Sequence, residues 1–82
     1  MFDKLTALQQ KEVLKYLPRA KELANRYFPG EGGEDLLDEL ESEAEFALVL
    51  AVYYWSPSSE MSLKDFVDIN VKHSLRWFLS HG

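Results

Sequence analysis

The chain has 82 residues, enough for one domain that buries roughly 60% of the surface of its unfolded form. It contains no cysteine, which excludes disulfide bonds, thiolate catalysis and zinc sites with sulfur ligands. A formal net charge of −5 argues against an autonomous nucleic-acid-binding domain, because such domains carry a basic surface.

The sequence contains no predicted targeting or membrane-spanning segment. The residues from Met1 to Lys4 lead into mixed polar sequence, which is not typical of a signal peptide. The longest apolar run, residues 46–55, is far shorter than the ~20 residues that a membrane-spanning helix needs. We therefore expect a cytoplasmic protein without a membrane partner.

Two helical segments precede the first glycine-rich loop. Residues 3–17 are predicted to form a helix with Asp3 as its N-cap. The apolar residues of this segment are Leu5, Leu8, Val13, Tyr16 and Leu17. Pro18 either begins a second helix or kinks a continuous one. Residues 17–28 carry a clear 3.6-residue apolar repeat, and Pro29 ends it.

A longer helix is predicted over residues 34–55, because the carboxylates of its first turn suit the positive end of a helix dipole. The natural core stripe of this helix is Leu36, Leu37, Leu40, Ala44, Ala47, Leu48, Ala51 and Trp55. A strand over residues 47–55 is the competing prediction, which we reject because the sequence offers no second strand to pair with it. The apolar residues that lie mostly off this stripe are Phe46, Val49, Leu50 and Tyr53. What covers them is the main question that the sequence raises.

The last helix follows the connector 56–59. Ser62 and Asp65 resemble a capping box at its start. Its predicted buried residues are Leu63, Phe66, Val67, Val71, Ser74, Leu75 and Phe78. Its opposite face carries Asp65, Asp68, Ile69, Lys72, His73 and Arg76. We therefore predict one compact all-α domain of three or four helices over residues 1–82.

Acidic residues are concentrated in one stretch of the chain. No Lys or Arg occurs between Arg26 and Lys64 to balance them. They are Glu31, Glu34, Asp35, Asp38, Glu39, Glu41, Glu43 and Glu45. Such a block is either a solvated face or a surface that binds a basic partner.

Catalytic and metal-binding patterns are not found in the sequence. His73 and His81 lie eight positions apart, which is poor spacing for metal ligands. The glycine-rich stretch 30–33 lacks the lysine and the serine or threonine of a phosphate loop, and the carboxylates have no predicted catalytic partner. We expect no cofactor, no metal and no enzymatic activity.

Residues 17–79 resemble region 2 of the sigma-70 family of bacterial RNA polymerase initiation factors. The stretches that carry the resemblance are LPRAKELANRYF (17–28), DELESEAEFALVLAVYYWSP (38–57) and SLKDFVDINVKHSLRWFL (62–79). The stretch EDLLDE (34–39) also looks like the family's acidic motif, but the register that places this motif at 38–43 needs no gap downstream. The resemblance implies a small helical domain, with residues 1–16 as an additional N-terminal helix.

In the sigma-70 family, the long acidic helix binds the coiled coil of the largest polymerase subunit, the clamp helices. The resemblance assigns this contact to Glu39, Ser42, Glu43, Glu45 and Val49, and Phe46 lies among them. Acidic groups around apolar side chains suit a basic coiled coil. The alternative is that the N-terminal helix packs over this face, and both can share the long helix.

The promoter-binding half of the family is matched less closely. Phe66 and Asn70 fall where the family captures melted promoter bases, but Ile69-Asn70 replaces the tryptophan pair of primary sigma factors. Asp65 and Asp68 are expected to repel phosphate. The basic groups at positions where the family contacts upstream promoter DNA are Lys72, His73 and Arg76. They also suit the end of a helix dipole without any DNA.

The resemblance implies a transcription protein that binds RNA polymerase and contacts promoter DNA only within that complex. No part of the sequence resembles the helix–turn–helix of region 4. We expect an excised domain, a stand-alone half of a split sigma factor, or a small regulator or decoy that occupies the sigma site. A further expected partner is an anti-sigma protein or a second sigma-like subunit. The alternative function is an acidic adaptor or homodimer that uses Phe46, Val49, Leu50 and Tyr53, which the molecular size in solution would distinguish.

Overall fold

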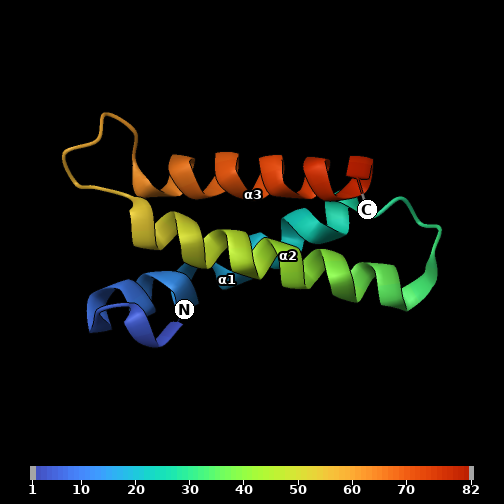
Figure 1. The fold of residues 1–82 in the computed structure, drawn as a ribbon, viewed down its shortest axis with the longest axis horizontal. Coiled ribbons are helices and arrows are strands. Elements are labelled where there is room, and N and C mark those ends of the chain that lie inside the picture. Colours follow the sequence, from blue (N-terminus) through green and yellow to red (C-terminus); the bar gives the residue numbers. More distant parts are fainter. Residues whose placement is uncertain (1, 82) are drawn as a thin grey trace.

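The computed structural model describes residues 2–81 and contains three α-helices that run up, down and up (Figure 1). A short 3-10 helix, Phe2–Lys4, precedes α1 (Ala7–Tyr27), α2 (Gly33–Tyr54) and α3 (Leu63–His81). No strand occurs among the described residues, so the all-α prediction is confirmed and the strand alternative is wrong.

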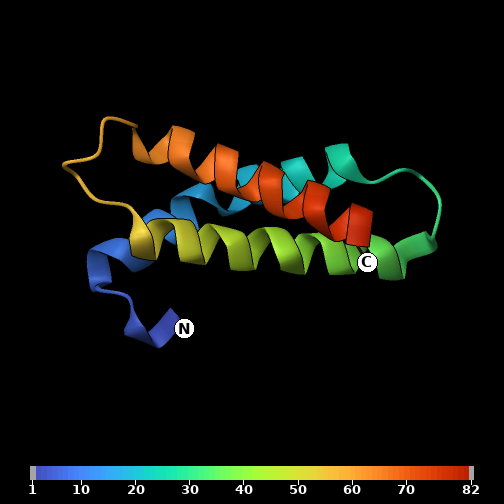
Figure 2. The same ribbon diagram turned by 45° about the horizontal axis from the view of Figure 1, so that its top comes forward.

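The helix α2 is the central element of this bundle. It contacts α1 and α3 extensively, whereas α1 and α3 contact each other less. The loops 28–32 and 55–62 lie at opposite ends of the long axis, as Figures 1 and 2 show. The bundle is elongated, with principal extents of 40 × 25 × 19 Å.

The start of α1 differs from the prediction. Thr6, and not Asp3, is the N-cap of this helix. Thr6 Oγ1 accepts from the Gln9 backbone N–H at 3.1 Å, and Gln9 Oε1 accepts from the Thr6 backbone N–H at 2.9 Å. This reciprocal pair satisfies two backbone donors at once, which explains why the helix begins here. Asp3 lies in the preceding 3-10 helix instead.

Pro18 lies inside α1, which continues through it as one helix from Ala7 to Tyr27. Of the two alternatives, the structure therefore contains the continuous helix. A proline in a helix interior removes one backbone hydrogen bond, and its ring crowds the carbonyl four residues earlier, here that of Leu14. Burial of Val13, Ala20 and other α1 residues in the core offsets this local cost.

Local caps define the starts of α2 and α3. Gly32 precedes α2 with φ of 102°, a left-handed conformation that glycine adopts without strain. A Cβ at this position would also approach Leu36 Cδ2 to 2.8 Å. At α3, Ser62 Oγ accepts from the Asp65 backbone N–H at 3.2 Å, which is one of the two bonds of the predicted capping box.

The core contains most of the residues predicted for it. Of the predicted α2 stripe, Leu40, Ala44, Ala47, Leu48 and Ala51 are buried. Val52 is buried as well, although it was not in the stripe, because α2 packs against two helices and therefore buries a wider arc. Trp55 is half-buried because it lies just beyond the end of the helix, as its C-cap.

An ion pair joins α1 to α3. Arg19 Nε donates to Asp68 Oδ1 at 3.2 Å, and a second guanidinium nitrogen donates to Oδ2 at the same distance. Arg19 also pairs with Glu22. The hydrogen bond with Asp68 is the main cause that raises the pKa of Arg19, and the hydrogen bond with Glu22 adds to it. Arg19 therefore stays protonated. Asp68, predicted on the open face of the last helix, is therefore engaged within the bundle.

We expect Pro18→Ala to stabilise the protein by about 1–2 kcal/mol. Alanine restores a helical hydrogen bond and removes the crowding at Leu14, although the unfolded chain gains some freedom. Urea unfolding followed by circular dichroism measures the change. The matched control is Lys21→Ala, another exposed α1 position, which is expected to change stability by less than about 0.5 kcal/mol. A lower stability of Pro18→Ala would contradict the expectation.

Candidate functional site

A groove of about 290 Å³ lies between α2 and α3. Its lining residues are Glu43, Phe46, Ala47, Leu50, Asn70, His73, Ser74 and Trp77. It joins the two predicted contact sets, because Glu43 and Phe46 were assigned to polymerase and Asn70 and His73 to DNA.

Helix geometry explains why these residues meet. The four α2 positions have the spacing i, i+3, i+4 and i+7, and the four α3 positions repeat that spacing. Residues at this spacing share one face of a helix. Since α2 and α3 run in opposite directions side by side, their two faces form the walls of one groove.

One hydrogen bond crosses the groove and joins its two walls. Ser74 Oγ donates to Glu43 Oε1 at 2.7 Å, and Glu43 is half-buried. This contact connects a predicted polymerase-binding carboxylate to a residue predicted for the α3 core face. Glu43 retains a second oxygen that can accept a bond from a partner.

Large apolar side chains remain exposed along the groove and beyond it. The exposed fractions are 53% for Phe46, 39% for Tyr53 and 56% for Trp77. Val49 and Leu50 are half-buried, and Val49 packs against the core cluster. Neither α1 nor α3 therefore covers Phe46 and Tyr53, whereas Val49 belongs in part to the fold.

The remaining predicted polymerase contacts also lie on α2, outside the lining of the groove. Glu39 and Ser42 are exposed, and Glu45 is half-buried. Within residues 2–81, the side chains of these three residues form no hydrogen bond or ion pair with the rest of the chain. Glu39 and Glu45 therefore keep their charges available to a partner.

The predicted DNA contacts are divided between the core and the surface. Phe66 is half-buried and packs against the core cluster, which limits the area of its ring that can stack on a base. Asn70 donates to the Phe66 carbonyl at 2.8 Å. Arg76 Nε donates to the Lys72 carbonyl at 3.3 Å, and His73 is exposed.

Trp77 is the groove residue that the sequence analysis missed. It lies next to the predicted core residue Phe78, and its indole ring stacks on His81 with centroids 4.5 Å apart. The His81 ring contacts the Trp77 carbonyl at 2.9 Å. The position of Trp77 four residues after His73 was the signal that could have assigned it to the outer face.

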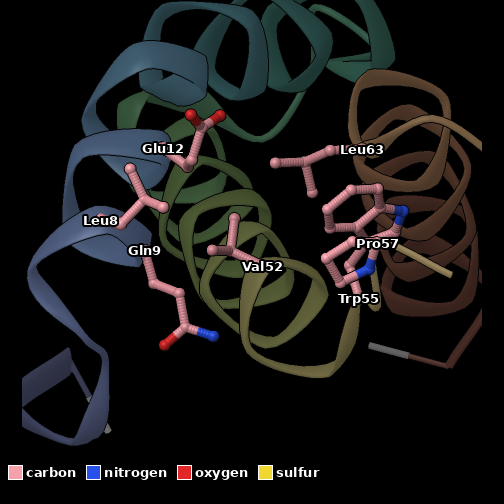
Figure 3. A pocket seen from close by; sticks show the side chains of 7 residues that line it. All are labelled: Leu8, Gln9, Glu12, Val52, Trp55, Pro57 and Leu63. Atoms are coloured by element: carbon pink, nitrogen blue, oxygen red, sulfur yellow. The ribbon is translucent and has the colours of Figure 1, made fainter.

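A second pocket, of about 340 Å³, lies where the start of α1, the end of α2 and the following connection meet (Figure 3). Its lining residues are Leu8, Gln9, Glu12, Val52, Trp55, Pro57 and Leu63. None of these residues was assigned to a binding site from the sequence. The pocket and the groove share no lining residue, so each can be altered without the other.

Two further findings concern the described part of the chain as a whole. Residues 2–81 contain no group of three or more His, Cys, Asp or Glu side chains arranged to hold a metal ion. Among the same residues, no helix combines the length and the apolar character needed to cross a membrane.

We expect Phe46→Ala to lower the free energy of unfolding by less than about 1 kcal/mol, because more than half of this side chain is already exposed. The matched comparison is Leu48→Ala, a fully buried position two residues away, with an expected loss of about 2–5 kcal/mol. Urea unfolding of both variants measures the difference. Equal losses would show that Phe46 supports the fold and is not free for a partner.

No protein-family model matches the sequence, and no curated protein or solved structure matches it either. The resemblance to sigma region 2 therefore rests on the quoted stretches alone. The geometry establishes an all-α domain of three helices with an apolar groove between α2 and α3.

Proposed function

We propose that the chain is a transcription-initiation protein that binds the clamp helices of RNA polymerase through the exposed face of α2. The sequence resemblance to sigma region 2 suggests this partner. The structural observation that carries the proposal is the exposure of Phe46 and Trp77 in a groove beside the unpaired carboxylate of Glu39. Glu45 lies on α2 outside this groove and is also unpaired.

A groove of this composition fits a partner helix that is both apolar and basic. Exposed aromatic rings such as Phe46 and Trp77 lose water on binding, and rings of this kind dominate the binding energy of many interfaces. Glu39 and Glu45 attract a basic surface and speed its association. The absence of Lys and Arg between residues 26 and 64 leaves this attraction unopposed along α2.

Lys72 and Arg76 support a second contact, with promoter DNA inside the polymerase complex. Both lie on α3, and neither forms an ion pair with a carboxylate in the described chain. Asp68, which would repel phosphate, is engaged by Arg19. Two cations neutralise too few phosphates for tight binding by a chain of net charge −5, so polymerase must supply most of the affinity.

We expect Glu45→Lys and Phe46→Asp each to weaken binding to an isolated clamp-helix fragment by at least about tenfold. The first change reverses an attractive charge, and the second places a charge in the apolar contact. Isothermal titration calorimetry at low and moderate salt measures the affinity, which should fall with salt for the wild type. Val49 is unsuitable for this test because it also packs against the core.

The matched control for the charge reversal is Glu60→Lys, which makes the same change in the exposed 55–62 connection. It is expected to bind like the wild type. Full affinity in both the Glu45→Lys and the Phe46→Asp variants would contradict the proposal. If the fragment does not bind and light scattering shows a dimer that Phe46→Asp dissociates, the groove binds a second copy of the chain instead.

We expect a Lys72→Ala, Arg76→Ala double variant to reduce retention of promoter DNA by the polymerase complex while leaving clamp-helix binding unchanged. Each lost phosphate contact should lower the salt dependence of the DNA affinity by about one unit of slope. Fluorescence anisotropy at several salt concentrations measures this. The control is a Lys11→Ala, Lys21→Ala variant, exposed on α1. Unchanged retention in the test variant would favour a sigma-mimicking regulator without DNA contact.

A further inference from the structure

The second pocket lies outside the proposed polymerase contact and combines apolar and polar lining residues. Figure 3 shows Leu8, Gln9 and Glu12 of α1 facing Leu63, Trp55 and Pro57 across an open space, with Val52 of α2 between them. Leu8 on α1 is 70% exposed, so its side chain is open to contact with a ligand. A volume of about 340 Å³ lies near the lower end of the range of small ligand pockets, roughly 300–1,000 Å³.

The polar groups of the pocket restrict what it can bind. The indole N–H of Trp55 donates to the Met61 carbonyl at 2.8 Å, so it cannot donate to a ligand. Gln9 Oε1 accepts from the Thr6 backbone in the helix cap. Glu12 is half-buried, and within residues 2–81 its carboxylate has no hydrogen bond or ion pair.

The pocket therefore presents apolar walls, one aromatic ring, the amide N–H groups of Gln9 and one unpaired negative charge. An anionic ligand would be repelled by Glu12, and a neutral apolar ligand would offer the Glu12 carboxylate no hydrogen-bond partner. A ligand with an apolar stem and a cationic end satisfies both the walls and the carboxylate.

We propose that this pocket binds the side chain of an arginine presented by a protein partner. The guanidinium group is planar and weakly hydrated, pairs with a carboxylate through two hydrogen bonds, and stacks on aromatic rings. The ammonium group of lysine is more strongly hydrated and lacks the planar face that suits Trp55. The aliphatic stem of arginine packs against Leu8 and Leu63.

The test is a titration of ¹⁵N-labelled protein with N-acetyl-arginine amide, followed by NMR. The expected result is saturable binding in the millimolar range, with a shift of the Trp55 indole N–H signal. The Trp77 indole signal is an internal control, because Trp77 lies in the α2–α3 groove. A Trp77→Phe variant assigns the two signals. The N-acetyl-citrulline amide is the uncharged match of the ligand and is expected to bind about tenfold more weakly.

Two variants test the roles of the charge and of the apolar wall. Glu12→Gln is expected to weaken arginine binding about tenfold and to leave citrulline binding unchanged. Its matched control is Glu34→Gln, an exposed position in the first turn of α2, which should bind like the wild type. Leu8→Asn should weaken both ligands, and circular dichroism confirms that each variant is folded.

Three outcomes would overturn the proposal. They are equal binding of the arginine and citrulline ligands, equal affinities of Glu12→Gln and Glu34→Gln for arginine, and shifts of the Trp55 and Trp77 signals to the same extent. Because the pocket and the groove share no residue, a failure here leaves the polymerase proposal standing. Failure of the clamp-helix experiment likewise leaves this one standing.

Discussion

The structure depends on α2 burying apolar side chains against two helices at once. The small residues Ala44, Ala47 and Ala51 are buried in α2, and small side chains allow neighbouring helices to approach closely, while Leu40 and Leu48 fill the space between them. The remaining side of the helix faces solvent. The apolar run at the end of α2 therefore contains residues that pack against α1 and α3 and residues that are exposed to solvent.

Hydrophobic periodicity predicted the helices and most of the core, because burial of an apolar stripe is what stabilises these helices. It could not predict that Val52 is buried, since that depends on how α3 and α1 are placed around α2. The N-cap was assigned to Asp3, although Thr6 and Gln9 have the spacing of a capping box, a signal that the sequence analysis overlooked. Likewise, the engagement of Asp68 with Arg19 joins residues 49 positions apart, beyond the reach of local patterns.

In the groove, too, sequence patterns predicted some features and missed others. The sequence placed Phe46 off the core stripe of a single helix and left open whether the N-terminal helix covers it, and the structure shows it exposed. The position of Trp77 in the groove and the Glu43–Ser74 hydrogen bond depend on how α2 and α3 pack together, which local sequence patterns do not predict. The acidic groups also differ in kind: Glu22 and Asp68 pair with Arg19, whereas Glu39 and Glu45 remain unpaired in the described chain.

The short loops 28–32 and 55–62 have a consequence for the kinetics of folding. Because each helix packs against the next one in sequence, most contacts join segments that are close along the chain. Helical bundles with such local contacts fold within microseconds to milliseconds. The core side chains of α2 and α3, such as Leu48 and Leu75, are then exposed to solvent only briefly after synthesis, which limits the time in which an unfolded chain can aggregate through them.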